Sequence, residues 1–105
     1  MASERRMQKR IPVFIDTYCK GVAKAGMGRL SDLSLGGCRI TSSIPLAQDD
    51  KAVLTLYLGR DGSLTVLGRV VSIGEKSVGV KFENVTASLR FQIEEVLKSV
   101  NEVRA

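Results

Sequence analysis

The sequence predicts an all-β domain of six short strands followed by one C-terminal helix. Runs rich in Val, Ile, Leu and Thr recur between residues 11 and 82, and glycine and polar turns separate them. From about residue 87 the hydrophobic spacing changes to that of an amphipathic helix. The chain has 105 residues, of which 44 % are hydrophobic and 26 % charged, and this composition suits a single domain with one modest core.

The six strands are separated by short connections, which favour antiparallel neighbours in a sandwich or barrel. In the first strand Val13 and Ile15 share one face, and a turn is expected at Ala25 and Gly26. The six predicted strands cover residues 12–23, 28–33, 38–41, 52–58, 64–73 and 77–82.

Glycines mark the expected turns and bends. Gly36 and Gly37 are expected to reverse the chain by adopting positive backbone torsions. The Asp61–Gly62 pair is a hairpin signal between the fourth and fifth strands. Three more glycines are expected inside strands, where they permit bulges and sharp bends: Gly21, Gly68 and Gly79.

The final helix is expected at about residues 87–103, as a lid over one end of a barrel. Thr86 or Ser88 can cap it. Its apolar side chains recur at helical spacing: Leu89, Ile93, Val96, Leu97 and Val100. Phe91 lies off this stripe, and we interpret it as part of a wide core face rather than as a contact for a partner.

Basic charge is concentrated at the N-terminus. The first ten residues carry four cations against Glu4, a net +3 of the chain's total of +5. Such a segment binds anions or is a solvated tail.

The chain has no histidine, and Cys19 and Cys38 show no metal-ligand spacing, so both cysteines are expected to be small buried apolar residues. No signal peptide or spanning segment is recognisable, which favours the cytoplasm.

Two motifs combine groups that suit a guanine nucleotide. Arg6 and Arg10 form R-x-x-x-R, and an arginine fork can hold the O6 and N7 acceptors of guanine or the oxygens of a phosphate. Asp32, Ser34 and Gly37 form D-x-S-x-x-G. A carboxylate accepts from the N–H groups on guanine's Watson–Crick edge, a hydroxyl donates to a phosphate, and glycine permits close backbone approach. Each motif alone also has an ordinary explanation, as a basic tail or as a turn that satisfies its own amides.

With these motifs in this order, the chain resembles the PilZ domain family of bacterial cyclic di-GMP receptors. The resemblance extends over nearly all of the sequence. It is carried by residues 6–13, by residues 32–40, by residues 68–71, and by residues 78–82 before a helix. It implies a six-stranded antiparallel β-barrel of the PilZ split-barrel type with a C-terminal helix.

The resemblance also implies a ligand, cyclic di-GMP, with no cofactor or metal. The implied ligand-binding residues are Arg5, Arg6, Arg10, Asp32, Ser34, Gly36 and Gly37. Within this set the arginines would contact guanines and phosphates, and Asp32 and Ser34 would read the base edge. A basic residue at Arg5 favours an intercalated ligand dimer.

The expected organisation is a flexible basic arm over residues 1–11 and a barrel with its helix over residues 12–105. Ordering of the arm by the ligand would produce a switch. Its signal is expected to pass to an unidentified downstream protein or to a changed self-association, and a homodimer stays open. Neither nucleic acid nor membrane insertion is expected.

Two other functions are weighed against this one. The first is a PilZ-fold interaction module that acts without nucleotide. The second is a small barrel that binds single-stranded nucleic acid, which the pI of about 9.6 suggests. It is disfavoured because the five aromatic residues are few and are expected mostly in the core. An enzyme is not expected, because the sequence has no histidine, activated nucleophile or phosphate loop of the Walker type.

Overall fold

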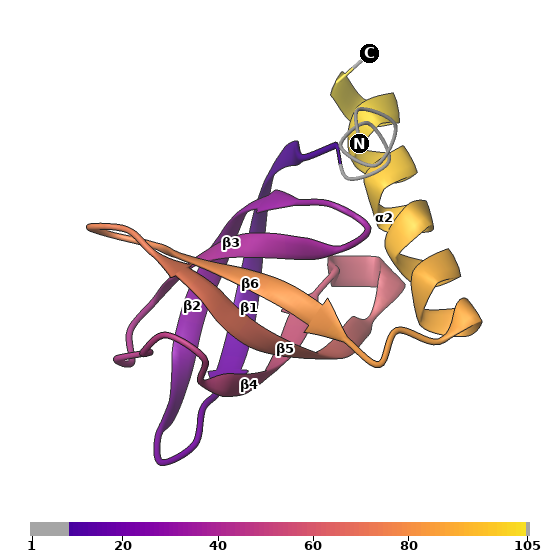
Figure 1. Cartoon of the computed structure of the whole chain (residues 1–105). Helices are drawn as coiled ribbons and strands as arrows, with labels where there is room; N and C mark the ends of the chain where they lie inside the picture. The colour runs from indigo at the N-terminus through magenta and orange to yellow at the C-terminus, as the bar shows by residue number, and fades with distance from the viewer. Residues whose placement is uncertain (1–8, 105) are drawn as a thin grey trace.

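The computed structural model describes residues 9–104, which form a closed antiparallel β-barrel with one α-helix beside it (Figure 1). The elements are β1 (Ile11–Lys20), β2 (Ala25–Leu33), β3 (Gly37–Ser42), β4 (Lys51–Tyr57), the 3₁₀ turn η1 (Gly59–Asp61), β5 (Ser63–Ile73), β6 (Val78–Glu83) and α2 (Ala87–Arg104). The strand order around the barrel is β1-β2-β3-β6-β5-β4. The predicted class, six antiparallel strands and a C-terminal helix, is confirmed.

The barrel interior is filled by alternating apolar side chains from all six strands. On β4, Leu54 and Leu56 are fully buried, and they face inward together with Val66 and Val70 of β5. Cys19 and Cys38 belong to this same core, which confirms their expected role as small apolar residues.

The helix packs one apolar row against the barrel. Thr86 is the N-cap, because its hydroxyl accepts a hydrogen bond of 3.1 Å from the backbone N–H of Leu89. Ile93 is 1 % exposed and lies in the core, and Leu97 packs against it. No helix in the described part of the chain is both long enough and apolar enough to cross a membrane.

The prediction that Phe91 belongs to the core face is wrong, since its side chain is 62 % exposed. Ile93 lies two positions further along the helix, which corresponds to a rotation of about 200° around its axis. The expectation that most aromatic residues are in the core is also wrong. Phe82 is buried, but four rings are exposed: Phe14, Tyr18, Tyr57 and Phe91.

The first turn lies earlier than predicted. β1 ends at Lys20 and β2 already begins at Ala25, so Ala25 and Gly26 are in a strand. Gly21 lies in the turn instead, where its N–H donates to the carbonyl of Lys24 at 2.8 Å. The bulge expected near Gly79 is present, because the β5–β6 register shifts between Val70 and Ser72.

The glycines with positive φ differ from those predicted. In the described chain they are Gly59, the first residue of the 3₁₀ turn between β4 and β5, and Gly62, which directly follows that turn. Gly36 and Gly37 do not have positive φ, so that prediction is wrong. The β2–β3 turn is closed instead by the hydroxyl of Ser34. Position 37 requires glycine because a Cβ atom there would clash with β6.

Candidate functional site

Arg10 and Asp32 are brought together on the outer surface of the barrel. Arg10 precedes β1, and Asp32 lies near the end of β2, where it pairs with Pro12. The Nη1 atom of Arg10 lies 3.5 Å from Oδ1 of Asp32, and these side chains are 54 % and 22 % exposed. An exposed pair at this distance contributes little to stability. The guanidinium and the carboxylate are therefore both available to a ligand.

Ser34 organises the turn between β2 and β3. Its side-chain oxygen accepts hydrogen bonds from the N–H groups of Gly36 (3.3 Å) and Gly37 (3.2 Å), and its hydroxyl donates to the carbonyl of Gly37 at 3.2 Å. Ser34 is 4 % exposed. Ser34 therefore satisfies the amides of its own turn, which was the ordinary explanation of the D-x-S-x-x-G motif. A direct contact of Ser34 with a ligand stays a prediction.

Replacement of Ser34 by alanine is expected to lower the free energy of unfolding by about 1–2 kcal/mol, because two half-buried amides lose their acceptor. Urea denaturation measures this change. The control is Ser31→Ala, whose exposed hydroxyl makes only a 3.5 Å contact with the carbonyl of Arg39. Unchanged stability together with lost ligand affinity would contradict a turn-forming role.

Gly36 and Gly37 fix the turn against β6. The carbonyl of Gly36 accepts a hydrogen bond of 2.8 Å from the N–H of Phe82. Gly37 pairs with Lys81, and a Cβ atom at position 37 would clash with the carbonyl oxygen of Val80. The absence of a side chain thus allows β3 to approach β6, and any approach of a ligand to this backbone stays a prediction. Arg5 and Arg6 lie outside the described residues.

Two cations near the site were not assigned a role from the sequence. Arg39 is the cross-strand partner of Asp32, but its guanidinium donates to the hydroxyls of Ser77 (3.1 Å) and Ser72 (3.4 Å). Lys81 is exposed beside the Gly37 turn. Strand alternation could have placed Arg39 on the outer face, two residues after Gly37. Lys81 could not be placed, because the β3–β6 pairing joins strands that are not consecutive in the chain.

Cys38 lies on the inner face behind the site. The pKa of this thiol is raised from 9.0 to about 12, mainly by burial and also by the charge of Asp32, while Arg10 lowers it. Burial also raises the pKa of Cys19, while a hydrogen bond with Ser42 lowers it. Both groups are therefore neutral thiols at physiological pH.

We expect neither cysteine of the folded protein to react with a thiol reagent at pH 7–8, and both to react in denaturant. The folded pKa of Cys38 lies above 9.0, so its contribution to stability is complete below pH 9.0 and is lost as the pH rises toward about 12. Timed alkylation followed by mass spectrometry tests the first statement. Rapid labelling of Cys38 under native conditions would show that the barrel opens behind the site.

Three cations lie on the same outer face as Asp32: Arg10 pairs with its carboxylate, Arg39 is its cross-strand partner, and Lys81 lies opposite Gly37. Guanidinium groups suit phosphate oxygens and the acceptor edge of guanine, whereas the carboxylate suits N–H donors. The site can therefore hold an anionic ligand that also presents hydrogen-bond donors.

Comparison with known proteins identifies related folds. The model of the PilZ domain family matches residues 4–99. The PilZ domain of YcgR from Escherichia coli, solved with c-di-GMP, has a TM-score of 0.85 and 21 % identity, over 95 % of this chain and 94 % of that chain. The PilZ domain of CeSA from a cellulose-synthesizing bacterium has a TM-score of 0.73 and 16 % identity, over 89 % and 98 % of the two chains.

A third similar structure belongs to a longer protein. The K. pneumonia MrkH–c-di-GMP complex has a TM-score of 0.73 and 23 % identity, and it covers 95 % of this chain and 54 % of that chain. At these identities the likeness establishes the fold. A search of curated proteins gave no match.

Proposed function

Because the chain belongs to the PilZ domain family, we propose that it is a non-enzymatic receptor for cyclic di-GMP that signals through another protein. The observation that carries this proposal is the Arg10–Asp32 pair, which joins residues 22 positions apart on an accessible outer face. Two structurally similar proteins, YcgR and MrkH, were solved with this ligand, and they support the choice of nucleotide.

In the proposed complex the arginines and the carboxylate have complementary tasks. Arg6 and Arg10 bind guanine O6 and N7 and the phosphates, and Arg10 exchanges its long contact with Asp32 for the ligand. Asp32 accepts from the N–H donors of the base. Arg39 and Lys81 add positive charge for the second phosphate.

The N-terminal segment completes the proposed site. Residues 1–11 would act as the arm that closes over the ligand, and the barrel with its helix would supply the fixed half. Arg5 favours two stacked ligand molecules per chain. The proposed outcome is a changed surface that a downstream protein in the cytoplasm reads.

Calorimetric titration with cyclic di-GMP tests this function, with GMP as the nucleotide control. Saturable binding of one or two ligands per chain, together with a rise in melting temperature, is expected. Absence of both heat and a thermal shift at excess ligand would reject it.

Single-stranded nucleic acid is the second candidate, because four aromatic rings are exposed rather than buried. One of these rings is already covered, since the guanidinium carbon of Arg29 lies 4.1 Å from the ring centroid of Phe14. Retention of an oligonucleotide in a gel shift at physiological salt, without any response to cyclic di-GMP, would favour this candidate.

A further inference from the structure

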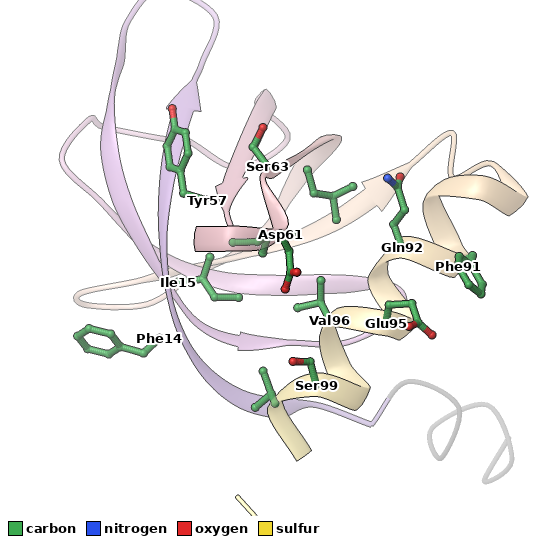
Figure 2. Close-up of a pocket in the computed structure, with 13 residues that line it drawn as sticks. Phe14, Ile15, Tyr57, Asp61, Ser63, Phe91, Gln92, Glu95, Val96 and Ser99 are labelled. Atoms are coloured by element: carbon green, nitrogen blue, oxygen red, sulfur yellow. The ribbon is translucent and has the colours of Figure 1, made fainter. Parts of the chain in front are cut away.

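A second concave surface lies between β1, the η1 turn and α2 (Figure 2). This groove has a volume of about 620 Å³ and includes Ile15, Leu64 and Val96 in its lining. The site residues Arg10, Asp32 and Ser34 do not line it. It is therefore separate from the proposed nucleotide site.

The helix presents a distinct row to this groove. Phe91, Glu95 and Ser99 are spaced four residues apart, so they follow one another along one face of α2. Ile93 belongs to the row that packs on the barrel. The ring of Phe91 is 62 % exposed and that of Tyr57, across the groove, is 47 % exposed. Aromatic rings left in solvent beside a groove are typical of protein interaction sites.

The groove is acidic, although the chain is basic overall. Among the described residues, the charged ones that line it are Asp61 and Glu95, and in Figure 2 the Asp61 side chain lies between Ile15 and Val96. Three cations of η1 and α2 do not line it: Arg60, Arg90 and Lys98. The ion pairs among the described residues involve other acids. Within residues 9–100 neither carboxylate has an ion-pair partner, so an incoming cation can pair with them, in a chain whose net charge is +5.

We propose that this groove binds a basic segment of a partner protein, in which an aromatic or leucine side chain flanked by Lys or Arg inserts between Tyr57 and Phe91. The apolar lining receives the anchor, and Asp61 and Glu95 pair with its flanking cations.

Binding of the basic segment in the groove does not require cyclic di-GMP. Only the control of this binding by the ligand rests on the proposed function, which it deepens. Phe14 and Ile15 of β1 line the groove four and five residues after Arg10, which directly precedes that strand. A ligand that repositions Arg10 therefore acts on a strand that forms one wall of the groove.

The test uses a fluorescein-labelled helical 12-residue peptide with Lys and Arg around a Leu–Phe pair, and a matched peptide with Glu in place of the cations. Fluorescence anisotropy of the full chain should show saturable binding of the basic peptide alone at physiological salt. The double variant Asp61→Lys/Glu95→Lys should weaken binding at least about 10-fold, and Phe91→Ala should weaken it about 5-fold or more.

The matched control is Glu75→Lys/Glu94→Lys, which changes the net charge equally through exposed acids outside the groove. It should keep wild-type affinity for the peptide, and all variants should keep their affinity for cyclic di-GMP. Equal losses in the two double variants would overturn the proposal. Failure of cyclic di-GMP to bind would reject the proposed function while leaving the peptide result intact.

Peptide binding and sedimentation distinguish two other occupants of the groove. If Arg5→Glu/Arg6→Glu raises peptide affinity more than about 10-fold, the chain's own N-terminal segment fills the groove, and the partner proposal is overturned. If sedimentation shows a concentration-dependent dimer that Phe91→Ala abolishes, a second copy fills it, and the proposal is again overturned.

Discussion

Replacing Arg10 with alanine should lower the affinity for cyclic di-GMP by at least about 100-fold. Arg10 is placed to make charge-assisted hydrogen bonds, each of which contributes about 1.5–3 kcal/mol, and loss of two such bonds exceeds the 2.8 kcal/mol or so that corresponds to 100-fold. The fold should be unaffected, because the exposed pair with Asp32 at 3.5 Å contributes less than about 1 kcal/mol.

The matched control for this variant is Arg60→Ala, which removes an exposed arginine from the η1 turn. It lowers the net charge equally and should leave the affinity for cyclic di-GMP within about 2-fold of wild type, since screening weakens distant exposed charges. Arg10→Lys should fall between the two, because lysine keeps the charge but lacks the planar fork. Equal affinities of Arg10→Ala and Arg60→Ala in calorimetry would remove Arg10 from the site.

Replacing Gly37 with alanine should lower the free energy of unfolding by about 2–4 kcal/mol. The new Cβ atom would clash with the carbonyl oxygen of Val80, and β3 would have to move away from β6. That pairing and the β1–β4 pairing are the two that join β1, β2 and β3 to the other strands of the closed barrel. Urea denaturation followed by circular dichroism measures the change.

Gly21→Ala is the control for this substitution, because its Cβ atom would meet only ordinary contacts at 3.4 Å or more. Its stability should stay within about 1 kcal/mol of wild type. A Gly37→Ala protein with wild-type stability and no affinity for cyclic di-GMP would contradict the steric role and would assign Gly37 to ligand approach.

The sequence predicted the parts of the fold that depend on local patterns. Strand alternation and helical spacing located all six strands and the row that includes Ile93. The first turn was placed too late, because Ala25 and Gly26 look like a turn but extend β2. The position of Phe91 was predicted wrongly, because helical spacing alone does not show whether a ring beside the apolar stripe packs on the barrel or is exposed.

The candidate site was predicted in part. The resemblance assigned Arg10 and Asp32 to one ligand site, and the structure places Nη1 of Arg10 3.5 Å from Oδ1 of Asp32. The hydrogen bonds of Ser34 and the close approach of Gly37 to Val80 depend on the turn and on β6, which the motif itself does not contain. Arg39 lies opposite Asp32 and Lys81 lies opposite Gly37, and the β3–β6 pairing that positions Lys81 is not revealed by one sequence.

The most direct test of the central claim, that the two motifs form one nucleotide site, is an NMR titration of the ¹⁵N-labelled full chain with cyclic di-GMP. The amides of Arg10, of Asp32 and of the Gly36–Gly37 turn should shift together and saturate at one or two ligands per chain. Amides at the far end of the barrel, around Lys24, should stay in place. Shifts confined to that end, or no shifts at excess ligand, would contradict the claim.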